Sequence, residues 1–333
     1  MKRREFIKRL AATTSTLIVG GIKPVIASDR LGSILPQRKL GKTGEKVTML
    51  VVGGYHVGWT TERDAQETIE AALEGGVRFF DTSQSYGDGE SEIRYGKYLI
   101  PKHRDLVFLM TKSNATDAKT VQKQLDESLK RLKTDYLDLW QIHSIRDPAD
   151  VDTRLENDVL EVFLKAKQEG KTRYIGFTGH RNPAAHERML EQVEDPDVFD
   201  TCQMPVNVLD PSSHSFIRRV MQSLLDRNIG LLAMKTLADG RFFAQKKRLD
   251  RIQWETDQPV VPGRVSLQEA LNFVWSLPVS VLITGAENAQ LMKEKIRLTN
   301  EFVSMQQTER DELINRVADM AIAGKVEYYK QVG

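Results

Sequence analysis

The chain has 333 residues, of which 40% are hydrophobic and 28% charged, a composition typical of a folded globular protein and not of a disordered one. Its formal net charge of +2 gives no indication of a nucleic-acid-binding surface, so we expect no nucleic-acid partner. The single cysteine, Cys202, excludes an intramolecular disulfide and a cysteine-ligated cluster, and its apolar surroundings predict a buried thiol.

The first 27 residues have the pattern of an export signal. Their basic residues exceed their acidic ones by five, which leaves about −3 for the rest of the chain. An apolar stretch over 10–22 is too short to span a bilayer permanently. Arg3-Arg4 resembles the twin-arginine (Tat) signal of proteins that cross the membrane folded. We therefore expect a Tat signal peptide over 1–27, the Tat machinery as a partner, a periplasmic location and no stable membrane insertion; an ordinary basic amphipathic helix is the alternative.

A β-hairpin is predicted next, over 38–50. Gly44 lies between two short segments of this stretch and is a typical turn residue. The hairpin precedes the first of a series of longer apolar runs. We expect it to cover one end of the fold that these runs form.

Eight short apolar runs then alternate with longer segments of helical pattern. The runs are almost continuously apolar, as is typical of parallel strands that are buried on both faces. They cover 47–54, 79–83, 106–112, 136–144, 174–179, 199–206, 230–237 and 281–286.

The intervening segments are amphipathic. The first helix is expected between Thr61 and Gly75, because hydroxyl residues are typical of helix starts and glycine of helix ends. Another segment, 121–133, places Val121, Leu125, Leu129 and Leu132 on one stripe. These patterns predict helices that pack one apolar face on the strands.

Eight strand–helix cycles within about 250 residues predict an α/β fold, the (β/α)₈ TIM barrel. A two-domain, doubly wound sheet would need a linker, and we find none between residues 37 and 300. We therefore expect one domain over 28–333, with the N-terminal hairpin and extra C-terminal helices. The segment 238–264 is a long insertion after the seventh strand, of a length that is usually functional or mobile.

An ionisable residue lies at the carboxyl end of each of three neighbouring strands of this predicted barrel. Asp81 ends the second strand and leads to Tyr86, Lys112 ends the third, and His143 ends the fourth. Active sites of such barrels lie at the carboxyl ends of the strands, and a charge there is costly to bury alone. We expect these four side chains to meet.

Together they can polarise a carbonyl group and protonate its oxygen. A phenol with an ordinary pKa of about 10 is a poor acid at pH 7, and an ammonium beside it can lower that pKa. Lys112 is the expected cation, Asp81 holds it, and His143 orients the substrate oxygen against Tyr86. The hydride must come from a cofactor, since no side chain donates one.

The chain resembles the aldo-keto reductases over residues 37 to about 300. The resemblance rests on FFDTSQSYG with Asp81 and Tyr86, on MTK with Lys112, and on YLDLWQIH with His143. It implies that Tyr86 is the general acid or base, that Lys112 and Asp81 tune it, and that His143 orients the substrate. It also implies that NADP(H) binds without a GxGxxG fingerprint, which this chain lacks.

The resemblance also suggests a set of cofactor-binding residues. Thr178 and Gln203 match positions that hold the nicotinamide amide, whereas Met234-Lys235 replaces an aromatic that stacks on the ring. Gly285 and Ala286 offer backbone N–H groups to a phosphate. Because Gln290 replaces an arginine for the 2′-phosphate, NAD(H) remains an alternative to NADP(H). The expected residues are Gly54, Tyr55, Asp81, Thr178, Gln203, Met234, Lys235, Gly285, Ala286 and Gln290.

Other histidines and one tryptophan admit two interpretations. His56 and His180 follow strands and line a substrate pocket or belong to ordinary polar loops. Trp59 is a pocket wall or a packing residue. The remaining histidines, expected to be solvated, are His103, His186 and His214. No metal site is expected, because no carboxylate or cysteine accompanies these residues at ligand spacing.

The sequence as a whole predicts an NAD(P)(H)-dependent oxidoreductase that reduces a small-molecule aldehyde or ketone, or catalyses the reverse reaction. A rival interpretation is a non-catalytic nicotinamide-binding sensor or partner subunit on the same barrel. A hydrolase is disfavoured, because neither a nucleophile nor a metal site accompanies the histidines and aspartates.

Overall fold

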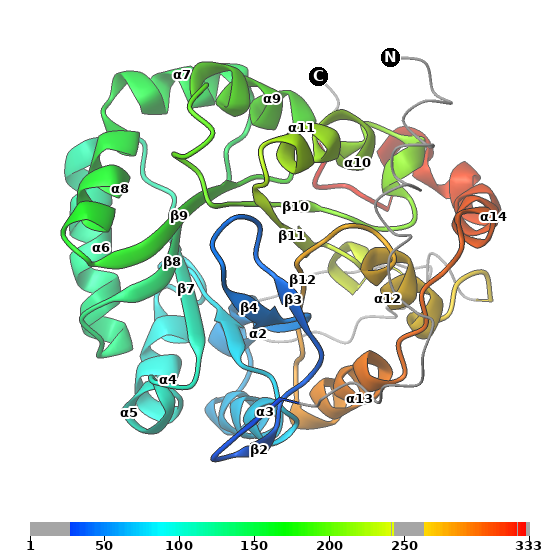
Figure 1. The fold of residues 1–333 in the computed structure, drawn as a ribbon, viewed down its shortest axis with the longest axis horizontal. Helices are drawn as coiled ribbons and strands as arrows, with labels where there is room; N and C mark the ends of the chain where they lie inside the picture. The colour runs from blue at the N-terminus through cyan, green and yellow to red at the C-terminus, as the bar shows by residue number, and fades with distance from the viewer. Residues whose placement is uncertain (1–26, 241, 243–262, 325, 331–333) are drawn as a thin grey trace.

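Eight parallel strands form a closed barrel that helices surround (Figure 1). The computed structural model describes residues 27–240, 242, 263–324 and 326–330. The predicted export signal and most of the 238–264 insertion lie outside the described residues. Neighbouring strands follow the order β10-β11-β12-β5-β6-β7-β8-β9, and pairing of β9 with β10 closes the ring. The predicted (β/α)₈ barrel is confirmed.

The barrel strands coincide with the eight apolar runs. They are β5 Leu50–Gly53, β6 Phe79–Asp81, β7 Phe108–Ser113, β8 Leu137–Ile142, β9 Thr172–Thr178, β10 Thr201–Pro205, β11 Gly230–Met234 and β12 Val281–Thr284. Most strands are shorter than the runs, since buried apolar residues continue into the loops. The first run divides at Met49, and its start belongs to the hairpin strand β4, Lys46–Thr48.

Helices cover the outside of the barrel. They are α2 Gly54–Trp59, α3 Glu62–Glu74, α4 Glu90–Tyr98, α5 Ile100–His103, α6 Ala118–Leu132, α7 Pro148–Glu156, α8 Val159–Gln168, α9 Pro183–Gln192, α10 Phe216–Arg219, α11 Met221–Asp226, α12 Leu267–Trp275, α13 Ala289–Asn300 and α14 Gln307–Val317, with short 3₁₀ turns at Asp210–Ser212, Ala238–Gly240 and Ala318–Gly324. As predicted, Thr61 caps α3 by accepting a hydrogen bond from the Asp64 amide, and Gly75 ends it. None of the described helices has the length and apolar character needed to cross a bilayer.

A hairpin closes the bottom of the barrel, where the amino ends of the strands lie. Strand β3, Gln37–Lys39, pairs antiparallel with β4, and Figure 1 shows the pair across the near end of the barrel. Leu40 and Val47 pack there against Phe79 and Phe108, the first residues of β6 and β7. The prediction that this hairpin covers one end of the barrel is confirmed. A second small hairpin, of β1 Ser28–Asp29 and β2 Gly32–Ser33, was not predicted.

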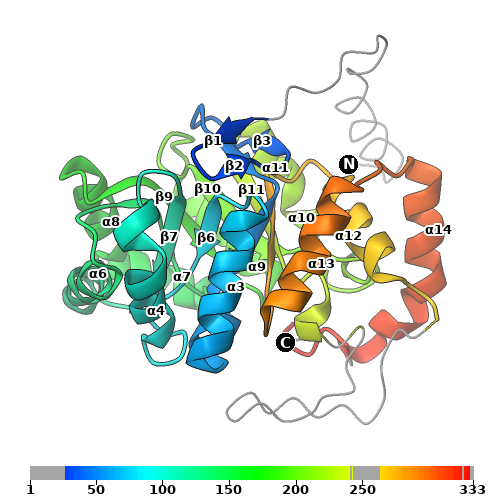
Figure 2. The same cartoon turned by 90° about the horizontal axis from the view of Figure 1, so that it is seen from below.

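The C-terminal segment reaches the opposite end, the mouth of the barrel (Figure 2). It is held by Lys330, whose buried ammonium lies 2.7 Å from Asp210 and 2.8 Å from Glu327. Asn207 donates a hydrogen bond of 2.8 Å to Glu327, and one of 3.1 Å to Tyr329. Because breaking a buried, hydrogen-bonded ion pair leaves an uncompensated charge, this cluster anchors the segment firmly to the loop after β10.

His186 of α9 lies in the core, so the expectation that it is solvated is wrong. Its ring is fully buried, 5.6 Å from Phe177 and 5.1 Å from Phe216 between ring centroids. The polar composition of α9 gave no indication of this burial. The helix nevertheless packs His186 against Phe177 of β9. Burial lowers the pKa of His186 to about 4.

This burial predicts a pH-dependent stability. The unfolded chain binds a proton at His186 below pH 6.5, and the native chain does so only near pH 4. The free energy of unfolding therefore decreases as the pH is lowered from about 6.5 to about 4, by up to about 1.4 kcal/mol per pH unit for this group. His186→Gln should flatten that slope in urea titrations between pH 7 and 4.5. The exposed His214→Gln serves as control, and an unchanged slope in His186→Gln contradicts the assignment.

Candidate active site

The mouth of the barrel holds a cavity of about 580 Å³, called the mouth cavity below. It lies at the carboxyl ends of the strands, where barrels of this architecture carry their sites. Nine of the predicted site residues line it: Tyr55, Asp81, Tyr86, His143, Thr178, Gln203, Met234, Lys235 and Gly285. Lys112 is fully buried directly beneath.

Two of the four predicted catalytic side chains, Asp81 and Tyr86, contact the ammonium group of a third, Lys112. The Lys112 Nζ pairs with the Asp81 carboxylate, donates to the Thr82 carbonyl at 2.7 Å and lies 3.3 Å from the Tyr86 hydroxyl. The pairing follows from register, because Asp81 lies opposite Met110 on β7 and Lys112 follows two residues later on the same face. The His143 ring completes the group, 5.7 Å from the Tyr86 ring between centroids.

The buried ion pair has shifted proton affinities. Burial raises the pKa of Asp81 to about 6, with the Lys112 ammonium acting against this shift. Burial likewise lowers the pKa of Lys112, and Asp81 opposes that change. At pH 7 the carboxylate is therefore ionised, and it balances the ammonium within the wall of the cavity.

The expected lowering of the Tyr86 pKa is wrong for the described structure. Burial raises the pKa of Tyr86 well above 10, and the nearby carboxylates of Asp81 and Asp239 act in the same direction. Asp81 offsets the wider electrostatic effect of the Lys112 ammonium on the pKa of the phenol, although the ammonium stays within hydrogen-bonding distance of the phenol oxygen. Tyr86 is consequently protonated at neutral pH, which is the state a proton donor needs.

His143 is neutral and hydrogen-bonded through one ring nitrogen. Burial lowers the pKa of His143 well below 6.5, and the positive charge of Lys112 adds a smaller shift in the same direction. Its Nδ1 lies 3.0 Å from the Ser83 hydroxyl, and its backbone N–H donates to the Ser113 carbonyl at 2.8 Å. A neutral imidazole held in this way can hydrogen-bond a ligand in the mouth cavity through Nε2.

Gln203 of β10 fits the amide of a nicotinamide. Its side chain is buried, and its Oε1 has no hydrogen-bond partner among the described residues. Its Nε2 lies 3.2 Å from the Met234 sulfur, which is a weak acceptor. A buried amide with an unused acceptor is costly without a ligand. Gln203 and the neighbouring Thr178 could therefore hold a carboxamide at this wall.

The chain matches a known protein family over most of its length. A sequence profile of the Aldo/keto reductase family matches residues 49–315. The chain belongs to the aldo/keto reductase family. Among curated relatives, L-galactose dehydrogenase of Arabidopsis thaliana is 38% identical over 154 residues, which are 43% of this chain and 48% of that protein. Aldo-keto reductase YhdN of Bacillus subtilis is 32% identical over 205 residues, 57% of this chain and 56% of the relative. These matches span about half the length of each relative.

Solved aldo/keto reductases share the fold. One from Bacillus halodurans, described as a holo form, superposes with a TM-score of 0.70 at 21% identity, covering 88% of this chain and 99% of that one. One from Klebsiella pneumoniae in complex with NADPH gives a TM-score of 0.65 at 21% identity, covering 85% and 95%. At this identity the likeness establishes the barrel architecture.

One wall of the aldo/keto reductase cavity comes from residues that the sequence did not reveal. Asp239 pairs with Lys235 at 2.5 Å and accepts a hydrogen bond of 2.6 Å from Tyr328. Tyr329 lies beside Tyr328 and also lines the cavity. Because 327–330 are anchored by Lys330, the C-terminal segment forms a fixed part of the wall of the mouth cavity. Nothing local in the sequence indicates this long-range contact.

The backbone of the mouth is strained at three lining residues. Ser144, Lys235 and Asp239 have φ values of 59°, 58° and 58°, in the left-handed region that residues with side chains rarely adopt. Such conformations persist where the surrounding structure holds them, and they concentrate at functional sites.

Some predicted residues lie outside the mouth cavity. Gly54, Ala286 and Gln290 are absent from its lining, and Gln290 is exposed on the first turn of α13. Trp59 is not a lining residue either; it packs 6.2 Å from the Tyr55 ring. Conversely, both His56 and His180 line the cavity, which resolves the two interpretations in favour of the pocket.

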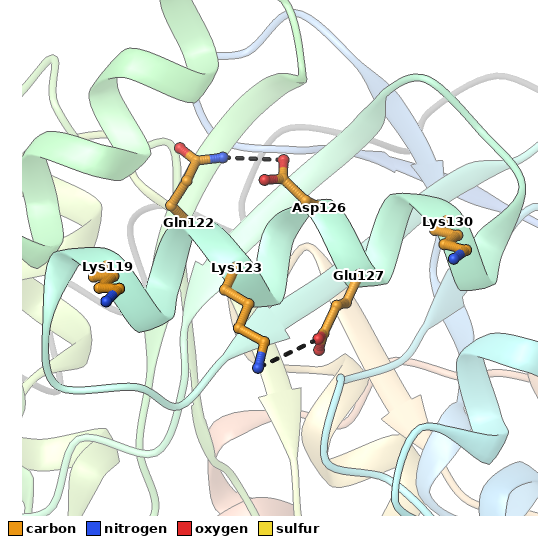
Figure 3. A pocket seen from close by; sticks show the side chains of 6 residues that line it. All are labelled: Lys119, Gln122, Lys123, Asp126, Glu127 and Lys130. Atoms are coloured by element: carbon orange, nitrogen blue, oxygen red, sulfur yellow. Dashed lines mark hydrogen bonds and ion pairs between the residues drawn. The ribbon is translucent and has the colours of Figure 1, made fainter.

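A second hollow, of about 410 Å³, lies on the outer face of α6 (Figure 3). Its polar side chains pair along the helix, with Gln122 donating to Asp126 at 3.0 Å and Lys123 lying 3.8 Å from Glu127. These are exposed contacts of a solvated helix face, which suit no specific ligand. In the part of the chain that the structure describes, no group of three or more His, Cys, Asp or Glu side chains forms a metal site.

Proposed function

We propose that this aldo/keto reductase is an NADP(H)-dependent enzyme that reduces an aldehyde or ketone to an alcohol, or catalyses the reverse, with Tyr86 exchanging the proton. The observation that carries the proposal is the Lys112 ammonium 3.3 Å from the Tyr86 hydroxyl at the mouth cavity. The NADPH complex of the Klebsiella pneumoniae enzyme supports NADP(H) as cofactor, with NAD(H) as the alternative.

The proposed cofactor site uses the wall next to Tyr86. When bound, the nicotinamide supplies the hydride. Gln203 accepts a hydrogen bond from its carboxamide and Thr178 contributes a hydroxyl, while Met234 and Lys235 line the adjacent wall. The cavity of about 580 Å³ has room for this ring and a small substrate.

The chain's own residues handle the substrate oxygen. His143 and Tyr86 hold a carbonyl oxygen between them and polarise it. As negative charge develops on that oxygen, Tyr86 transfers its proton there, and the ammonium of Lys112 stabilises the resulting phenolate. Asp81 keeps Lys112 in place throughout. In the reverse direction the phenolate accepts the proton of the alcohol.

Gln203→Leu is the test of the cofactor wall. It removes one hydrogen bond to the carboxamide, so we expect the Kd for NADPH to rise roughly fivefold. The unused Oε1 means that the cofactor-free protein should lose little stability. Fluorescence titration measures the affinity, and Gln222→Leu on α11 is the matched control. Equal affinities of Gln203→Leu and the unaltered protein would exclude this placement of the nicotinamide.

We also propose that residues 1–27 direct the mature domain, 28–333, to the periplasm through the Tat machinery, so that the protein is exported folded. The support is the sequence pattern with Arg3-Arg4. Replacing both arginines by lysine should retain the protein in the cytoplasm, as cell fractionation would detect. Unchanged periplasmic recovery would contradict a twin-arginine route.

A further inference from the structure

Ser83 is a buried hydroxyl next to the proposed proton-transfer group. It follows β6, is fully buried, and its Oγ lies 3.0 Å from Nδ1 of His143. The function proposed above uses the other ring nitrogen, Nε2. Whether Nε2 carries a proton decides whether His143 can donate to a substrate oxygen, and in a neutral imidazole this depends on what Nδ1 does.

The neighbours of Ser83 favour one direction of that hydrogen bond. A hydroxyl has one hydrogen to donate and two lone pairs. The Ser85 backbone N–H donates to the Ser83 Oγ at 3.4 Å, and the Ser85 hydroxyl lies 3.1 Å from it. When both Ser85 groups donate, the lone pairs of Ser83 are used. Its own proton is then left for Nδ1 of His143.

The opposite arrangement satisfies the same groups around Ser83 but turns an acceptor, and not a donor, toward the mouth cavity. If Nδ1 carried the proton, the Ser83 oxygen would face donors from His143 and from the Ser85 backbone. The Ser85 hydroxyl would then have to accept the Ser83 proton. Nε2 would present a lone pair to the mouth cavity, where it would repel the lone pairs of a carbonyl oxygen.

We propose that Ser83, supported by Ser85, is a positioning residue that fixes neutral His143 as the Nε2–H tautomer. The imidazole then donates to the substrate oxygen beside Tyr86, so that two donors face one acceptor. The His143 backbone is already fixed by its bond to Ser113, so the Ser83 contact sets the remaining rotation of the ring. This inference rests on the proposed function for its catalytic meaning, although the tautomer can be observed without turnover.

The direct test is ¹⁵N NMR of the full chain labelled at its six histidines. His143 is assigned by the signal lost in His143→Gln. We expect the unaltered protein to show a protonated Nε2 and an unprotonated Nδ1, and Ser83→Ala to give a mixture of tautomers. A protonated Nδ1 in the unaltered protein, or an unchanged His143 spectrum in Ser83→Ala, overturns the proposal.

Kinetics provide a second readout. Ser83→Ala should lower kcat/KM for a carbonyl substrate roughly five- to tenfold, with an unchanged Kd for NADPH. Ser83→Thr keeps the hydroxyl and should restore the Nε2–H signal. Ser276→Ala is the control, since this buried serine bonds the Asn272 carbonyl far from the mouth. If the unaltered protein reduces no carbonyl compound, the proposed function fails, while the NMR spectrum still decides the role of Ser83.

Discussion

Tyr86→Phe is expected to lower kcat by roughly 10³-fold, because it removes the proposed proton donor and leaves the ring in place. Its hydroxyl lies 3.3 Å from the Lys112 ammonium and its raised pKa keeps it protonated at neutral pH. The phenylalanine ring preserves the packing against Tyr55 and His143. Consumption of NADPH with an aldehyde measures the loss, and fluorescence titration should give a nearly unchanged Kd for NADPH.

The control for this variant is Tyr98→Phe. The Tyr98 hydroxyl bonds Glu62 on the outside of the barrel, 2.6 Å away, so its removal should leave turnover unchanged. Activity of Tyr86→Phe within tenfold of the unaltered protein would mean that another group, or water, protonates the substrate.

Lys112→Met is expected to cost about 3–5 kcal/mol of the free energy of unfolding. The variant leaves the Asp81 carboxylate alone in a site where the side chains of the pair are 0% and 3% exposed. It should also abolish turnover, because no cation then stabilises the phenolate of Tyr86. Urea unfolding and NADPH consumption measure the two effects.

The double variant Asp81→Asn/Lys112→Met separates stability from catalysis. Without either charge it should regain most of the lost free energy of unfolding, since a neutral pair needs no compensation. Its turnover should stay as low as that of Lys112→Met. If Lys112→Met alone lowered the free energy of unfolding by less than about 1 kcal/mol, the ion pair would have to be solvated.

The fold was predictable because burial on both faces imposes near-continuous apolar runs on parallel strands. The runs fixed the number and order of strands, but not their ends. The run at 47–54, for example, contains two strands that pair with different partners, β3 and β6. No glycine or proline separates the two strands, and the chain bends at Met49, so the sequence pattern joins them in one run.

The candidate site was predictable where an ionisable side chain lies at the carboxyl end of an apolar strand, as at Asp81 and Lys112. Such positions are conspicuous because burial of a lone charge is costly. Asp239 and Tyr328 carry no such signal, since their contact joins segments 89 residues apart. The predicted direction of the Tyr86 pKa shift was wrong. The sequence indicated a neighbouring cation, Lys112, but not how deeply the phenol is buried, and burial is the larger effect.

We expect NADPH to bind in the mouth cavity and to reduce a carbonyl group there. Rapid mixing of the NADPH-loaded protein with a panel of aldehydes and ketones, followed at the absorbance of NADPH, tests this expectation most directly. We expect at least one carbonyl compound to oxidise one equivalent of bound NADPH in a single rapid phase. Tight binding of NADPH without oxidation across the whole panel would contradict it and favour a sensor or partner subunit.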